Sequence, residues 1–201
     1  MELLFPLLLL AAGFQIVKGR EQQRRIQLLG QYLERHQIEK LMETLLTGYL
    51  RALGEETDER RAQIFSMLVS AETDLRDQVQ RLAEDFSKVW SDHTLVSTLP
   101  VALPYADKLV PSATFDMRKA LALHAAGIEA VVNNTDGRTE KDKAFTLTAE
   151  ILLLQHTCHW FCRSRTVATA RMLARHQTHY QQLLESVSPQ TREAYQRLAL
   201  R

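Results

Sequence analysis

One regular stripe of apolar residues limits the fold of this chain more than any other sequence feature. Its members recur at steps of three and four residues: Ile64, Leu68, Ala71, Leu75, Val79, Leu82, Phe86 and Val89. This spacing places them on one face of an α-helix. Charged residues, among them Asp74, Asp77 and Arg81, occupy the other face. The pattern predicts a long helix whose interaction stripe packs against other helices, as in a bundle or coiled coil.

The residues before the stripe predict a helix that pairs with it. Apolar positions from Ile26 onward keep the same helical period, and Gly54 is a suitable C-cap. Thr57 or Asp58 can then N-cap the striped helix. Because the connection is short, residues 26–93 are expected to form an antiparallel helical hairpin.

The second half of the chain predicts another hairpin. Three prolines interrupt residues 94–111, which are therefore expected to form a linker. Residues 112–201 return to a helical pattern, with a turn at residues 133–138. From Thr139 to the residue before Pro189 no Pro or Gly occurs, so one helix of nearly fifty residues is allowed, whether continuous or broken. Pro189 suits the first position of a short closing helix.

These patterns together predict an all-α protein. Two long antiparallel helical hairpins, arranged as a four-helix bundle or an elongated helical assembly, would be joined by the Pro-containing linker. An apolar helix would precede them. With 7 Gly and 5 Pro in 201 residues, the chain has few of the turn formers that a β-sandwich or barrel requires.

Residues 1–25 combine an apolar run with a basic flank. Residues 3–17 are apolar except for Gln15. The flank that follows consists of Lys18, Arg20, Arg24 and Arg25. Positive charge after the run, not before it, disfavours a signal peptide and places the body in the cytoplasm and the N-terminus outside. We therefore expect a membrane anchor, although fifteen residues are fewer than the ~20 of a typical span. Burial against protein, in a soluble cytoplasmic chain, and a cleaved signal are the alternatives.

The sequence "HTCHWFC", residues 156–162, is the main candidate for a metal or haem site. If the second hairpin turns near Asp136, His156 faces Asp116 across it, as His124 faces Thr148. The candidate ligands are therefore Asp116, His156, His159 and Cys162. Neither a Cys-x-x-Cys nor a His-Glu-x-x-His motif occurs. The pattern favours packing of these side chains in a helix, with a redox role for Cys158 and Cys162 as a further alternative.

The functional expectation is a non-enzymatic protein. A net charge of +1 gives no indication of a nucleic-acid partner, and the arginines between positions 163 and 175 spread around their helix as a solvated surface would. Neither a Gly-rich phosphate loop nor a nucleophile elbow is present. We expect a membrane-anchored helical scaffold or assembly protein that binds protein partners, or itself, through helix faces and requires no cofactor. The alternative is a helical bundle that binds a metal or haem at residues 156–162.

Overall fold

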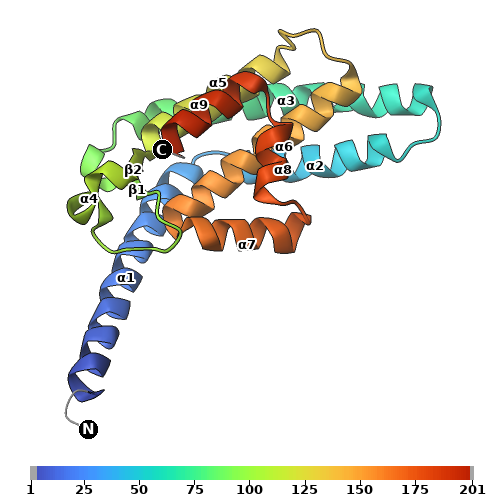
Figure 1. Cartoon of the computed structure of the whole chain (residues 1–201). Helices are drawn as coiled ribbons and strands as arrows, with labels where there is room; N and C mark the ends of the chain where they lie inside the picture. The colour runs from blue at the N-terminus through green and yellow to red at the C-terminus, as the bar shows by residue number, and fades with distance from the viewer. Residues whose placement is uncertain (1–3, 200–201) are drawn as a thin grey trace.

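The computed structural model describes residues 4–199, apart from the side chains of Leu4, Phe5 and Asp107. The ends of the predicted segments 1–25 and 112–201, residues 1–3 and 200–201, lie outside this range. Helices dominate the described chain, as the sequence predicted (Figure 1). In order they are α1 (Leu4–Leu33), α2 (Ile38–Leu53), α3 (Asp58–Ser87), α4 (Ala106–Leu109), α5 (Met117–Val132), α6 (Glu140–Cys162), α7 (Arg165–His176), α8 (Tyr180–Ser186) and α9 (Pro189–Ala199).

Helices α2 and α3 form an antiparallel hairpin (Figure 1). Gly54 is the C-cap of α2, and the Thr57 hydroxyl accepts a hydrogen bond from the Arg60 backbone N–H at the start of α3. The predicted helix that begins at Ile26 is not continuous, however. It breaks over residues 34–37, a polar stretch in which the Gln37 backbone N–H donates to Gln78 Oε1 at 2.6 Å. Because of the break, α1 takes its own direction. The first half of the chain therefore consists of three helices, α1, α2 and α3, and residues 26–33 belong to α1 and not to the hairpin.

The striped face of α3 is covered by the chain's own helices. Leu68, Leu75, Val79, Leu82 and Phe86 are buried, in contact with the core that α2 and α5 complete. Ile64, at the exposed end of the hairpin, is partly buried. The stripe therefore builds the core of the protein itself.

A small sheet that the sequence did not indicate joins the predicted Pro-containing linker, residues 94–111, to residues 114–116, where a helical pattern was expected. Strands β1 (Leu95–Ser97) and β2 (Thr114–Asp116) pair antiparallel, with Val96 opposite Phe115. Both of these apolar side chains are buried, and Trp160 Nε1 donates to the Ser97 carbonyl at 2.9 Å. The sheet is thus fixed to α6.

The allowed fifty-residue helix is broken into α6, α7 and α8. Arg163 leaves the helical conformation with φ −132° and ψ −87°, and the Ser164 hydroxyl accepts the Val167 N–H to start α7. A second break follows Gln177, which has φ 52°. The first break turns α7 back along α6 (Figure 1). Ser164 thus shows that a serine that caps the following helix can end the preceding helix in the absence of Pro or Gly.

Helix α1 has two halves with different surroundings. Its C-terminal half packs against α3 and α6, while its N-terminal half projects from the helical body (Figure 1). Within the described range, none of the helices is both long enough and apolar enough to cross a bilayer. The membrane-crossing segment predicted at residues 3–17 is thus not found over residues 4–17, its described part.

Candidate functional site: an exposed apolar helix and its basic base

The projecting half of α1 carries the largest group of exposed apolar side chains among the described residues. We call residues 6–17 the apolar arm. Six of its large side chains are between 43 and 71% exposed: Leu7, Leu8, Leu9, Leu10, Phe14 and Ile16. Continuous exposed apolar surface of this kind marks a binding site in a folded protein. The arm is helical throughout, so beyond the first turn of α1 its backbone N–H groups are hydrogen-bonded within the helix.

The four basic residues after the arm divide into two roles. Arg20 and Arg24 are exposed, Lys18 is half-buried, and Arg24 contacts the His93 ring. Arg25 instead turns toward the body. It pairs with Glu21 at 2.6 Å, and it also donates to the Leu95 carbonyl at 3.1 Å. Three of the four predicted flanking residues therefore remain available near the arm, while Arg25 fixes α1 to the sheet.

The cluster at residues 156–162 is built into the packed interior. His156 is buried, and its Nε2 lies 3.1 Å from Thr169 Oγ1. The imidazole ring stacks on the ring of Tyr180, with the two centroids 4.5 Å apart. Burial lowers the pKa of His156 to about 3, so the ring is neutral at physiological pH. His159 is on another side of α6, where burial and Arg171 lower its pKa.

The two cysteines lie together along an apolar groove. Cys158 and Cys162 are free thiols that line a groove of about 260 Å³ between α1, α2 and α6. Burial raises the pKa of the Cys162 thiol to about 11 and raises that of Cys158 further. Both sulfurs are therefore protonated near neutral pH, which makes them poor nucleophiles.

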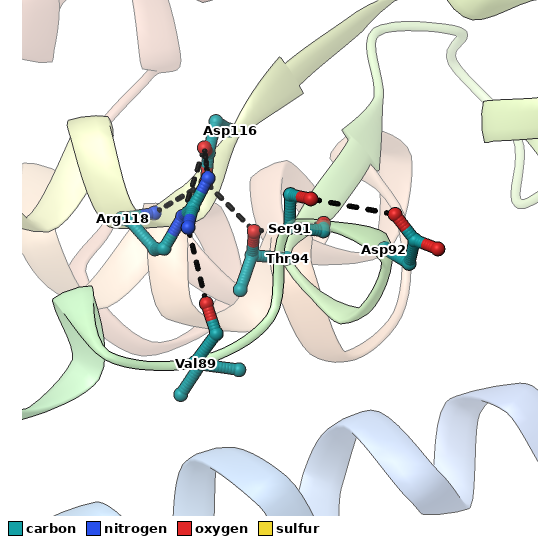
Figure 2. Close-up of polar contacts among 6 residues, drawn as sticks. All are labelled: Val89, Ser91, Asp92, Thr94, Asp116 and Arg118. Carbon is teal, nitrogen blue, oxygen red and sulfur yellow. Dashed lines mark hydrogen bonds and ion pairs between the residues drawn. The ribbon is translucent and has the colours of Figure 1, made fainter.

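Asp116, the fourth candidate ligand, is engaged elsewhere (Figure 2). It is the N-cap of α5 and pairs with Arg118, whose Nη2 lies 2.6 Å from Oδ2. The Thr94 hydroxyl donates to the same carboxylate at 2.8 Å, and Arg118 also reaches the Val89 carbonyl at 3.1 Å. Burial opposes ionisation of this carboxyl, but hydrogen bonds from Arg118 and Thr94 hold its pKa below the usual value. The Asp116 pair thus ties the sheet to α5.

The predicted pairing of α5 with α6 is wrong in register. His124 lies opposite Thr157, with Nε2 2.9 Å from Oγ1, and not opposite Thr148. The difference is nine residues, or about two and a half helical turns. Among residues 4–199, no three His, Cys, Asp or Glu side chains gather as a metal ion would require.

Sequence reasoning missed two buried polar groups. Glu72, on the striped helix, accepts hydrogen bonds from Tyr49 at 2.6 Å and from Lys143 at 2.5 Å. Glu150 accepts the Ser188 N–H at 3.1 Å, at the start of α9. Isolated charged residues in a helical pattern carry no signal of burial, so neither could be found from the sequence. Both connect helices that lie far apart in the chain.

Comparison of the chain with protein-family models, with curated proteins and with solved structures found no match in any of the three. Its own residues are therefore the basis for a functional inference. The apolar arm and the surface at its base are the features that point most clearly to a partner.

Proposed function

We propose that this protein is a membrane-attached interaction protein, non-enzymatic, with its body on the cytoplasmic side. The apolar arm would enter the hydrocarbon of the bilayer from that side without crossing it. The helical body would remain outside as a scaffold for a protein partner. The observation that carries the proposal is the exposure of six large apolar side chains on one projecting helix.

The chemistry of the arm favours lipid over protein as its surroundings. Residues 7–12 read "LLLLAA", so apolar side chains occupy all sides of the helix and not one stripe. A partner helix or groove covers one side, whereas lipid chains surround a helix completely. Full burial of a large apolar side chain gains roughly 1.5–3 kcal/mol. Since only part of each of the six side chains is still exposed, burying the arm would gain on the order of 5–10 kcal/mol.

The length of the arm fits entry without crossing. Residues 4–17 rise about 20 Å at 1.5 Å per residue, compared with a hydrocarbon thickness of about 30 Å. Lys18 and Arg20 follow at once and would lie at the level of the headgroups. Cations at that level are attracted to the anionic lipids of the cytoplasmic leaflet.

The outer face of the α2–α3 hairpin suits the scaffold role of the body. Leu50 is 74% exposed and Met67 77% exposed on this hairpin, which extends away from the arm (Figure 1). We expect these two side chains, one from each helix, to contact a helical partner.

Vesicle flotation of the full-length protein tests the proposal. We expect the chain to float with mixed phosphatidylcholine and phosphatidylserine vesicles. The variant Leu8→Asp/Leu10→Asp/Phe14→Asp should stay at the bottom of the gradient, because charges in hydrocarbon are strongly unfavourable. The matched control Leu50→Asp/Met67→Asp should float like the wild type. A wild-type chain that does not float, or an arm variant that still floats, would contradict the proposal.

A further inference from the structure

We infer that residues 100–110 form a second membrane contact, a seat on an anionic phospholipid surface beside the arm. This inference rests on the proposed function, because the arm must enter the bilayer for the seat to reach it. Residues 100–110 are the part of the predicted linker that follows β1 and contains α4.

The seat lies at the base of the arm. The Tyr105 backbone N–H donates to Glu21 Oε2 on α1 at 3.1 Å, and the Thr166 N–H donates to the Pro100 carbonyl at 3.1 Å. Lys18 and Val101 line the same small cleft between the segment and α1. Figure 1 shows α4 at the end of the body from which α1 projects. When the arm is inserted in a bilayer, residues 100–110 would therefore contact the membrane surface.

Three exposed apolar side chains of the seat indicate that it contacts an apolar environment. Val101 and Leu109 are each 65% exposed and Tyr105 is 53% exposed, while Pro104 and Ala106 are buried and hold the segment in place. Tyrosine is enriched at membrane interfaces, because its ring is apolar and its hydroxyl is polar.

The backbone of Tyr105 has an uncommon conformation. Its φ of 54° is in the left-handed region, which is unfavourable for a residue with a large side chain. Residues held in such conformations cluster at binding sites.

The charge around the seat selects an anionic lipid surface as the occupant. Two exposed cations lie beside Tyr105: Arg24 of α1 and Lys108 of the segment itself. Arg24 and Lys108 line an open cleft of about 180 Å³, together with the acidic Glu21 and Asp92. Because Asp107 precedes Lys108, the segment itself is neutral, and the excess positive charge comes from α1. A second copy of the chain on the same face would bring like charges together.

An apolar-to-polar variant of the full chain tests the seat. Val101→Ser/Tyr105→Asn/Leu109→Ser removes the three exposed apolar groups, and asparagine tolerates the left-handed backbone at position 105. We expect binding to phosphatidylserine-containing vesicles to weaken by at least about tenfold, while the protein still floats at high lipid concentration. The control Leu50→Ser/Met67→Ser should bind like the wild type. All the variants should keep the wild-type thermal melting temperature.

A charge variant tests the lipid preference. Lys108→Glu should weaken binding more than about fivefold on vesicles that contain phosphatidylserine, since losing one cation near an anionic surface removes about that factor and the new carboxylate is repelled as well. It should leave binding to pure phosphatidylcholine vesicles unchanged. Lys141→Glu, at the start of α6, is the matched control and should change neither.

The outcomes separate the two proposals. If the Ser/Asn/Ser variant binds like the wild type while the Leu8/Leu10/Phe14 variant is released, the seat is wrong and the arm stands. If both variants bind like the wild type, the proposed function fails as well. If the Ser/Asn/Ser variant changes the oligomeric state in size-exclusion chromatography without changing vesicle binding, the surface joins copies of the chain, which overturns the seat.

Discussion

Lys143 of α6 donates a hydrogen bond of 2.5 Å to Glu72 of α3, and both side chains are buried. Tyr49 of α2 donates to the other oxygen of the same carboxylate at 2.6 Å. The three residues connect three helices at one point inside the body. Glu72 therefore fixes how the α2–α3 hairpin lies against α6.

Breaking this pair should be costly. Lys143→Met leaves the Glu72 carboxylate buried without its cation, and we expect a loss of about 3–5 kcal/mol in the free energy of unfolding. The double variant Glu72→Gln/Lys143→Met should recover most of that loss, because a neutral amide can still accept from Tyr49. Urea denaturation measures both values. Equal stabilities of the single and double variants would show that the charge pair is not desolvated.

Buried histidines predict that acid destabilises the fold below neutral pH. Burial lowers the pKa values of His124 and His156 to about 3, from an unfolded value near 6.5. The unfolded chain therefore binds more protons between these values. Stability should be fully present above about pH 6.5 and should fall toward pH 3, by up to about 1.4 kcal/mol per pH unit for each histidine.

Three further groups enter the same measurement. His159 and His176 have pKa values lowered by burial and act in the same direction, whereas Glu150 has a pKa raised by burial and opposes it. Comparing the wild type with His124→Gln/His156→Gln isolates the two histidines. The slope of unfolding free energy between pH 5 and pH 6.5 should be smaller in the variant. An unchanged slope would mean that both rings take up protons in the folded chain as readily as in the unfolded chain.

A glycine in α5 should resist substitution. A Cβ at Gly127 would lie 2.8 Å from Glu150 Oε2 and would also clash with Thr191 Oγ1, where α9 packs on α5. We expect Gly127→Ala to cost about 1–3 kcal/mol of stability through overpacking. Gly30→Ala is the control, since nothing lies within 4 Å of its Cβ position in α1, and it should stabilise by about 0.5–1 kcal/mol. Thermal melting of the two variants should therefore shift in opposite directions.

The thiols at the apolar groove should react slowly. With the pKa of Cys162 near 11 and that of Cys158 raised further, the thiolate fraction at neutral pH is very small. We expect alkylation by iodoacetamide in the native protein to be about a hundredfold slower than for an exposed cysteine. Unfolding in urea should restore the normal rate. Fast alkylation of the native protein would revive a redox role for this pair.

Much of the helical architecture follows from the sequence because long patterns decide it. Helix α3 was predictable from the apolar stripe, of which all but Val89 lie within the helix, and its hairpin with α2 from Gly54 and Thr57. The sheet was not, since strands of three residues are too short to show an alternating pattern. The break at Arg163 and Ser164 was hidden for another reason. A serine can cap a helix only where the neighbouring structure makes the turn favourable.

The candidate site divides in the same way. The apolar composition of the arm was visible in the sequence. Whether other parts of the chain cover the arm depends on the break after Leu33, and no Pro or Gly at residues 34–37 indicates that break. The predicted His156–Asp116 contact required a register that depends on how residues 133–139 turn. Tyr105 belongs to the seat only through its exposure and its contact with Glu21. Tertiary packing decides each of these features.

The most direct test of the central claim is the depth that the apolar arm reaches in a bilayer. A polarity-sensitive fluorophore attached at Leu10→Cys reports this position, while the slowly reacting Cys158 and Cys162 remain unlabelled. On mixed phosphatidylcholine and phosphatidylserine vesicles, the emission should shift to the blue and should be quenched by lipids that carry a quencher on their acyl chains. The same label at Met67→Cys, on the α3 surface, should show neither change. Emission from position 10 that stays the same with and without vesicles would contradict the account.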